Sequence, residues 1–119
     1  MLVIRPEQVE VLSQYMLKQF ENRMIVHLRK SFPHETEEMS EVNLRELIQT
    51  GIERAKQYGV ELENDVQSYL EMMIIYGADF DTNSKTDWAG EILRTPDING
   101  TTKINLLEDY ELNLLRKET

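Results

Sequence analysis

Cysteine is absent from this chain of 119 residues, which also has only three prolines, five glycines and 8% aromatic residues. Without cysteine there is no disulfide, no thiolate metal site and no cysteine nucleophile. The scarcity of proline and glycine, together with an apolar fraction of 40%, argues against fibrous and disordered chains. We therefore expect one folded domain, since a length of about 100 to 200 residues is typical of one.

Long apolar runs are missing as well. The longest apolar cluster is residues 72–76, far short of the roughly 18 apolar residues that a membrane helix needs. Before Arg5 the chain has only a short apolar stretch, too short for the core of a signal peptide. These absences predict a cytoplasmic protein with no membrane partner.

Basic residues are few relative to acidic ones, with 13 Lys or Arg against 22 Asp or Glu and a net charge of -9. So acidic a chain is not expected to bind nucleic acid, because the phosphates would repel it. The charge is uneven: residues 1–34 carry five basic and three acidic residues, a net of +2, and residues 35–119 carry eight and nineteen, a net of -11. This acidic part favours a protein partner that tolerates or prefers negative charge.

Apolar residues do recur in this sequence at the spacing of a helix. After Pro6, a good first-turn residue, apolar residues recur every three or four positions until Leu28. Because Pro33 ends this segment, we predict one helix of about 25 residues, longer than the core of a small domain. Four more helices are predicted between Ser40 and Gly59 and over about 61–76, 87–94 and 103–117.

No strand alternation or internal repeat is present, and residues 34–41, rich in glutamate, are interpreted as a solvated linker or frayed turn. The predicted fold class is therefore all-α. We expect a single-domain bundle over residues 1–119, with about five helices of which the N-terminal one is the longest.

Asp79, Asp81 and Asn83 occupy alternate positions between two predicted helices, as the first three ligands of a helix-loop-helix calcium site do. The pattern then departs from such a site, because Ser84 stands where a glycine is required and Gly90 where a glutamate is required. We expect a turn whose side chains bond local backbone groups, with a cation-dependent domain as the alternative.

Catalytic signatures are also missing. Neither His27 nor His34 has the i, i+4 partner of a helical metal site, and no serine stands in a glycine-flanked elbow. The five glycines are scattered, so no glycine-rich phosphate loop is formed. We expect a protein that is not an enzyme and needs no cofactor.

Apolar contact area remains as a functional feature. The first helix carries apolar residues off its main stripe, so more than one of its sides must be buried, by the other helices or by a partner. Methionine adapts to partner surfaces and tryptophan is enriched at binding hot spots. The predicted partner-binding residues, for which core packing is the alternative, are Met16, Phe20, Met24, Met72 and Trp88.

Three segments carry a resemblance to a known group. They are Ile4-Arg5-Pro6-Glu7-Gln8, Phe20-Glu21-Asn22-Arg23-Met24, and the stretch from Tyr69 to Leu93 with Gly77, Asp79-Phe80-Asp81 and Trp88-Ala89. Over about the first 95 residues the chain resembles small helical bacterial proteins encoded beside type VI secretion effector genes. That group often has a proline where this chain has Asp87.

The resemblance implies a partner and no catalytic residues. The partner would be a secreted effector or toxin, and the chain would act as its chaperone, adaptor or accessory protein. The alternative is an immunity protein that occludes the active site of a toxin, and self-association is a further possibility.

Overall fold

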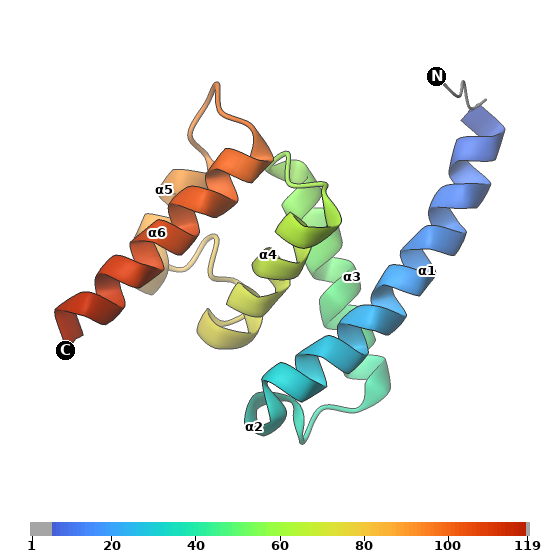
Figure 1. The fold of residues 1–119 in the computed structure, drawn as a ribbon, viewed down its shortest axis with the longest axis horizontal. Coiled ribbons are helices and arrows are strands. Elements are labelled where there is room, and N and C mark those ends of the chain that lie inside the picture. The colour runs from blue at the N-terminus through green and yellow to red at the C-terminus, as the bar shows by residue number, and fades with distance from the viewer. Residues whose placement is uncertain (1–5, 119) are drawn as a thin grey trace.

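The structure, a computed structural model, describes the backbone of residues 6–118 and the side chains of residues 14–117. These residues form helices and no strand, so the prediction of an all-α bundle is confirmed (Figure 1). In chain order the helices are α1 (Pro6–Ser31), α2 (Pro33–Thr36), α3 (Glu41–Gln57), α4 (Glu63–Tyr76), the 3-10 helix η1 (Ser84–Thr86), α5 (Asp87–Leu93) and α6 (Gly100–Glu118).

Helix α1 is the longest, as predicted, with 26 residues that begin at Pro6. It ends at Ser31, because Pro33 cannot continue the hydrogen-bond pattern. Its C-terminal half lies on the bundle, where Phe20, Met24 and Leu28 are buried at helical spacing.

The segment after α1 differs from the predicted linker, because residues 33–36 form the short helix α2. The Thr36 side chain is buried, and its hydroxyl donates a hydrogen bond to the carbonyl oxygen of Phe32 at 2.8 Å. Arg29 of α1 donates to the carbonyl oxygens of Thr36 and Met39, both at 2.9 Å. These bonds fold the segment back against α1, although its glutamates face the solvent.

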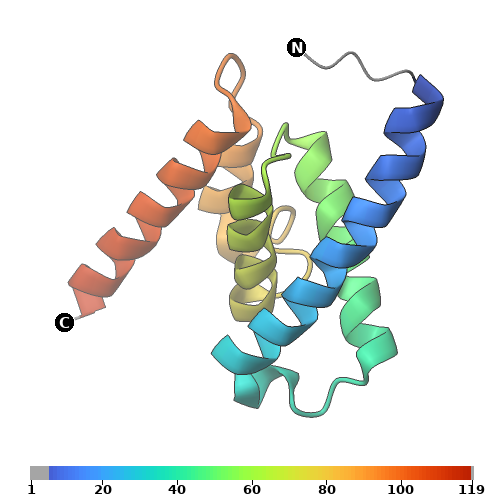
Figure 2. The same ribbon diagram turned by 45° about the vertical axis from the view of Figure 1, so that its right-hand side comes forward.

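Helices α3 and α4 lie side by side and run in opposite directions (Figure 2). The Ser40 side chain caps α3 by accepting a hydrogen bond from the backbone N–H of Asn43 at 3.1 Å. Gly59 then takes a left-handed φ of +80°, which turns the chain directly into α4.

Helix α4 is the centre of the bundle, since it packs against α3, α1 and α6. Tyr69 and Leu70 on α4 are fully buried, and Phe80 follows in the loop with its ring centroid 4.9 Å from that of Tyr69. One cluster of buried apolar side chains runs from Phe20 on α1 to Leu107 on α6.

The molecule is flat and extended, measuring 50 × 39 × 22 Å. Its radius of gyration is 15.4 Å, whereas a compact domain of this length has about 13.5 Å. Figures 1 and 2 show the reason: the N-terminal half of α1 and the C-terminal end of α6 both extend away from the α3–α4 pair.

Candidate functional site

An apolar groove lies where α1 leaves the bundle. All residues from Gln14 to Gln19 are exposed, and burial begins at Phe20. The side chains of Tyr15, Met16 and Leu17 are 66%, 58% and 40% exposed. This half of α1 therefore shows apolar side chains to the solvent beside α3 and α4, and the space between the helices is open.

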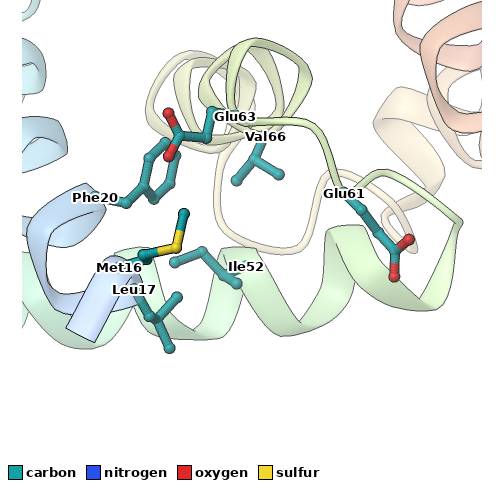
Figure 3. A pocket seen from close by; sticks show the side chains of 7 residues that line it. All are labelled: Met16, Leu17, Phe20, Ile52, Glu61, Glu63 and Val66. Carbon is teal, nitrogen blue, oxygen red and sulfur yellow. The ribbon is translucent and has the colours of Figure 1, made fainter. Parts of the chain in front are cut away.

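The groove is built from three helices and the turn between two of them. Met16, Leu17 and Phe20 come from α1, Ile52 from α3 and Val66 from α4. Figure 3 shows Met16, Phe20, Ile52 and Val66 pointing into one hollow, which has a volume of about 260 Å³. A second hollow of about 450 Å³ shares Leu17, Ile52 and Val66 with the first and extends it toward Val60. Together the two hollows form what we call the α1 groove.

The edge of the α1 groove is acidic. Glu61 and Glu63 border the first hollow, and Glu53 and Lys56 border the second. Glu63 accepts a hydrogen bond from Arg23 of α1 at 2.8 Å, with both side chains more than half exposed. An apolar floor with a negatively charged edge is suited to an apolar helix that carries basic residues.

Two polar contacts fix α1 on its neighbours below the groove. The Glu21 carboxylate, which is buried, accepts hydrogen bonds from Arg45 at 3.0 Å and Gln49 at 3.2 Å on α3. Closer to the end of α1, His27 Nε2 lies 2.6 Å from Glu71 Oε2 on α4. Glu21 was not among the predicted site residues, although its spacing of three and seven from Met24 and Leu28 places it on the buried stripe.

The structure places the five predicted interface residues in three different environments. Met16 lies in the α1 groove as an exposed side chain, and Phe20 forms its floor with 6% of its surface exposed. Met24 and Met72 are core residues with 5% and 2% exposed. We correct their assignment accordingly, because a partner cannot reach Met24 or Met72, nor most of Phe20, while the bundle stays closed.

Trp88, the fifth, lies among the aromatic residues next to α6, away from the α1 groove. Its ring stacks on Tyr110 with the centroids 4.6 Å apart and an interplanar angle of 12°. Tyr76 meets the same ring edge-on at 5.4 Å and donates a hydrogen bond to Glu111 at 2.8 Å. Trp88 is half-buried and joins α5 to α6 and α4, so it serves packing, and the five residues do not form one surface.

The loop of Asp79, Asp81 and Asn83, for which a cation site was the alternative to a self-bonded turn, uses its side chains to hold its own turn. Asn83 accepts a hydrogen bond from the backbone N–H of Lys85 at 2.8 Å, and its amide lies 3.4 Å from Asp79 Oδ2. Asp81 points the other way, into the protein, and accepts a bond from the Tyr58 hydroxyl at 2.6 Å. Among the described residues no group of three or more His, Asp or Glu is placed to hold a metal ion.

Asp81 is the most enclosed charge of this loop, with 5% of its surface exposed. Its Oδ1 lies 3.7 Å from Arg54, and its backbone oxygen accepts a hydrogen bond from Arg94 at 3.1 Å. Burial and the bond to Asp81 raise the pKa of Tyr58 to about 12, and burial followed by the charge of Asp81 raises the pKa of Tyr69. Both hydroxyls therefore stay protonated at neutral pH, and this cluster joins the loop to α3 and α4.

A second concentration of negative charge lies between α4 and α6. The pKa of Glu108 is raised, first by burial and then by the charges of Glu111, Glu71, Asp65 and Asp109. The carboxylates of two helices thus gather on one side of the molecule, in agreement with the net charge of residues 35–119.

Comparisons with known proteins add no relative. No protein-family model, curated protein or solved structure matches this chain. In the part of the chain that the structure describes, no helix is both long enough and apolar enough to cross a membrane.

Proposed function

We propose that this chain is a non-enzymatic protein-binding module that takes an amphipathic helix of a partner protein into the α1 groove. The observation that carries the proposal is the run of exposed apolar side chains on α1, above all Met16 and Leu17, beside an apolar hollow with an acidic edge. A helix that docks in a groove buries apolar anchors spaced by three or four residues, and the floor from Phe20 to Val66 offers matching apolar area.

The resemblance to proteins encoded beside type VI secretion effector genes supports a more specific role. In that role the partner is a secreted effector, and the chain is its chaperone, adaptor or accessory protein in the cytoplasm. Binding would cover an apolar helix of the effector before delivery, because exposed apolar surface otherwise promotes aggregation.

The acidic cluster around Glu108 favours an immunity protein as a second candidate. A basic toxin, such as one that degrades nucleic acid, would be attracted to this side of the molecule by complementary charge. In this case the contact lies on α4 and α6, so substitutions in the α1 groove leave it intact and added salt weakens it.

Site-specific photocrosslinking in the host cell tests the groove directly. A photoreactive residue in place of Leu17 should form an adduct with another protein, and Met16→Asp in the same chain should abolish that adduct. The matched control is the same photoreactive residue in place of Val26, which is also exposed on α1 but lies outside the groove. Equal adducts from both positions, or none from either, would contradict the proposal.

The identity of the crosslinked protein then separates the two roles. A chaperone predicts that the partner becomes insoluble or is degraded when this chain is deleted. Immunity predicts that the partner kills the cell when this chain is deleted, and that a crosslinker placed near Glu108 captures it while one at Leu17 does not.

A further inference from the structure

The C-terminal end of α6 is the strongest candidate for a second interaction surface. Leu112 and Leu115 on its last turns are 52% and 60% exposed, and Leu114 beside them is half-buried. The same turns carry the basic residues Arg116 and Lys117. In Figures 1 and 2 this end of α6 points away from the α3–α4 pair.

This helix end and the α1 groove are chemically complementary. One is an exposed helical segment with apolar side chains and a basic last turn, and the other is an apolar hollow bordered by three glutamates and one lysine, Glu53, Glu61, Glu63 and Lys56. Opposite charges at the edge of an apolar contact set the orientation of a docked helix. Lys117 is thus expected near the glutamates that border the groove.

The two surfaces cannot meet within one chain. Helix α6 begins at Gly100, which contacts the backbone of Gly59 and Val60, and Val60 lies in the wall of the α1 groove. From there α6 runs for 19 residues, so its C-terminal end is about 27 Å away along the helix. The N-terminal end of α6 is therefore next to the groove. The leucines at the C-terminal end of α6 can reach a groove only in another molecule.

We propose that the C-terminal end of α6 in one copy of this chain docks in the α1 groove of a second copy. The contact joins two different surfaces, so two copies can exchange their helix ends or further copies can add in sequence. The inference rests on the proposed function in one respect, because both use the α1 groove. Its consequence is regulation: the free protein covers its own groove, and a partner helix must displace α6 from it.

Analytical ultracentrifugation of the purified chain over a wide concentration range tests this contact. The natural sequence should associate reversibly, and both Leu17→Asp in the groove and Leu115→Asp on α6 should raise the dissociation constant at least tenfold. Val26→Asp is the matched control on α1, since it places the same charge on the same helix outside the groove and should leave association unchanged. Circular dichroism establishes that each variant is as helical as the natural chain.

Mixing the two defective variants separates this contact from any other form of self-association. The Leu17→Asp chain keeps an intact α6 and the Leu115→Asp chain keeps an intact groove, so an equimolar mixture should form a heterodimer through one contact. Lys117→Glu should weaken that heterodimer, and Glu61→Lys in the other chain should restore it. A charge exchange that restores binding shows that the two residues face each other.

Several outcomes would overturn the proposal. A natural chain that remains monomeric at every concentration would do so, and so would a mixture that stays monomeric although each variant is folded. Association that is lost with Leu115→Asp but kept with Leu17→Asp would show that α6 contacts another α6. These results leave the crosslinking test untouched, because a partner protein captured at Leu17 supports the proposed function even when the purified chain is a monomer.

Discussion

Individual buried polar residues connect parts of this fold through hydrogen bonds. Asp81 is the clearest example, because its carboxylate is almost fully buried and takes the hydroxyl of Tyr58 as its hydrogen-bond donor. Tyr69 lies beside it in the core, and its hydroxyl has no hydrogen-bond partner among the residues that the structure describes. Two tyrosines of one cluster thus make opposite contributions, since a buried polar group stabilises the fold when it is paired and costs free energy when it is not.

A pair of phenylalanine substitutions tests this difference. Tyr58→Phe removes the donor from a buried carboxylate and should lower the free energy of unfolding by about 1.5 to 3 kcal/mol. Tyr69→Phe removes an unpaired hydroxyl and should leave stability unchanged or slightly higher. Urea unfolding of both variants measures the difference, and an equal loss in the two would contradict the assignment.

At the scale of elements, close contacts at the start of α6 fix this helix on the bundle. Helix α6 is fixed at its start, where Gly100 meets the backbone of Gly59 and Val60 and Thr101 donates a hydrogen bond to Asp65 at 2.6 Å. Lys103, one turn later, donates to the backbone oxygen of Tyr58 at 2.9 Å. The N-terminal turns of α6 are therefore anchored, whereas its last turns contribute exposed leucines.

Gly100→Ala tests the anchored end of α6. An added Cβ would overlap the backbone of Gly59, which has no flexible side chain to move aside, so stability should fall by about 1 to 3 kcal/mol. Helix propensity alone would act in the opposite direction, since alanine is the better helix former. Thermal unfolding monitored by circular dichroism measures the effect, with Asn105→Ala on the exposed side of α6 as a nearly neutral control.

At the scale of the whole molecule, negative charge is distributed unevenly. Carboxylates from α4 and α6 gather around Glu108, and burial and their repulsion raise its pKa above the ordinary value of 4.5. A group whose pKa is higher in the folded state favours folding in its protonated form. Its contribution is therefore full below about pH 4.5 and is lost as the pH rises through the raised pKa.

Glu108→Gln should accordingly raise the melting temperature at pH 7 and have little effect at pH 4. The expected gain is small because Glu108 is itself exposed to solvent, and it should shrink in high salt because the repulsion is screened. Glu91→Gln on α5 removes the same charge from a residue outside the carboxylates that raise the pKa of Glu108, and serves as the control for net charge alone. A gain of the same size in both variants would show that the location of Glu108 does not matter.

The order and approximate bounds of the long helices could be predicted because their signals are local. Pro6 and Pro33 bracket α1, Ser40 caps α3, and Gly59 and Gly77 end the helices of the central pair. The short helix α2 lacks such local signals and was not predicted. Its segment is held by the hydrogen bonds of Arg29 and the burial of Thr36, not by its own glutamate-rich sequence.

The site could be predicted only in part. A stripe of apolar residues with helical spacing does not state where along the helix the core ends, so Met16, Phe20 and Met24 are equivalent in the sequence. The structure separates them, since Met16 is exposed, Phe20 forms the floor of the groove and Met24 is core. Burial depends on which helices cross α1, and that is a property of contacts distant in the chain.

The sequence alone determined the all-α class, the long first helix, and the acidity of residues 35–119, because helical period, caps and charge are read from neighbouring residues. Only the tertiary structure decided that α1 leaves the bundle before Phe20 and that Asp81 is buried against Tyr58. It also placed the start of α6, not its end, beside the groove. These features arise where α1, α3, α4 and α6 meet, and the packing of several helices cannot be read from the periodicity of any one of them.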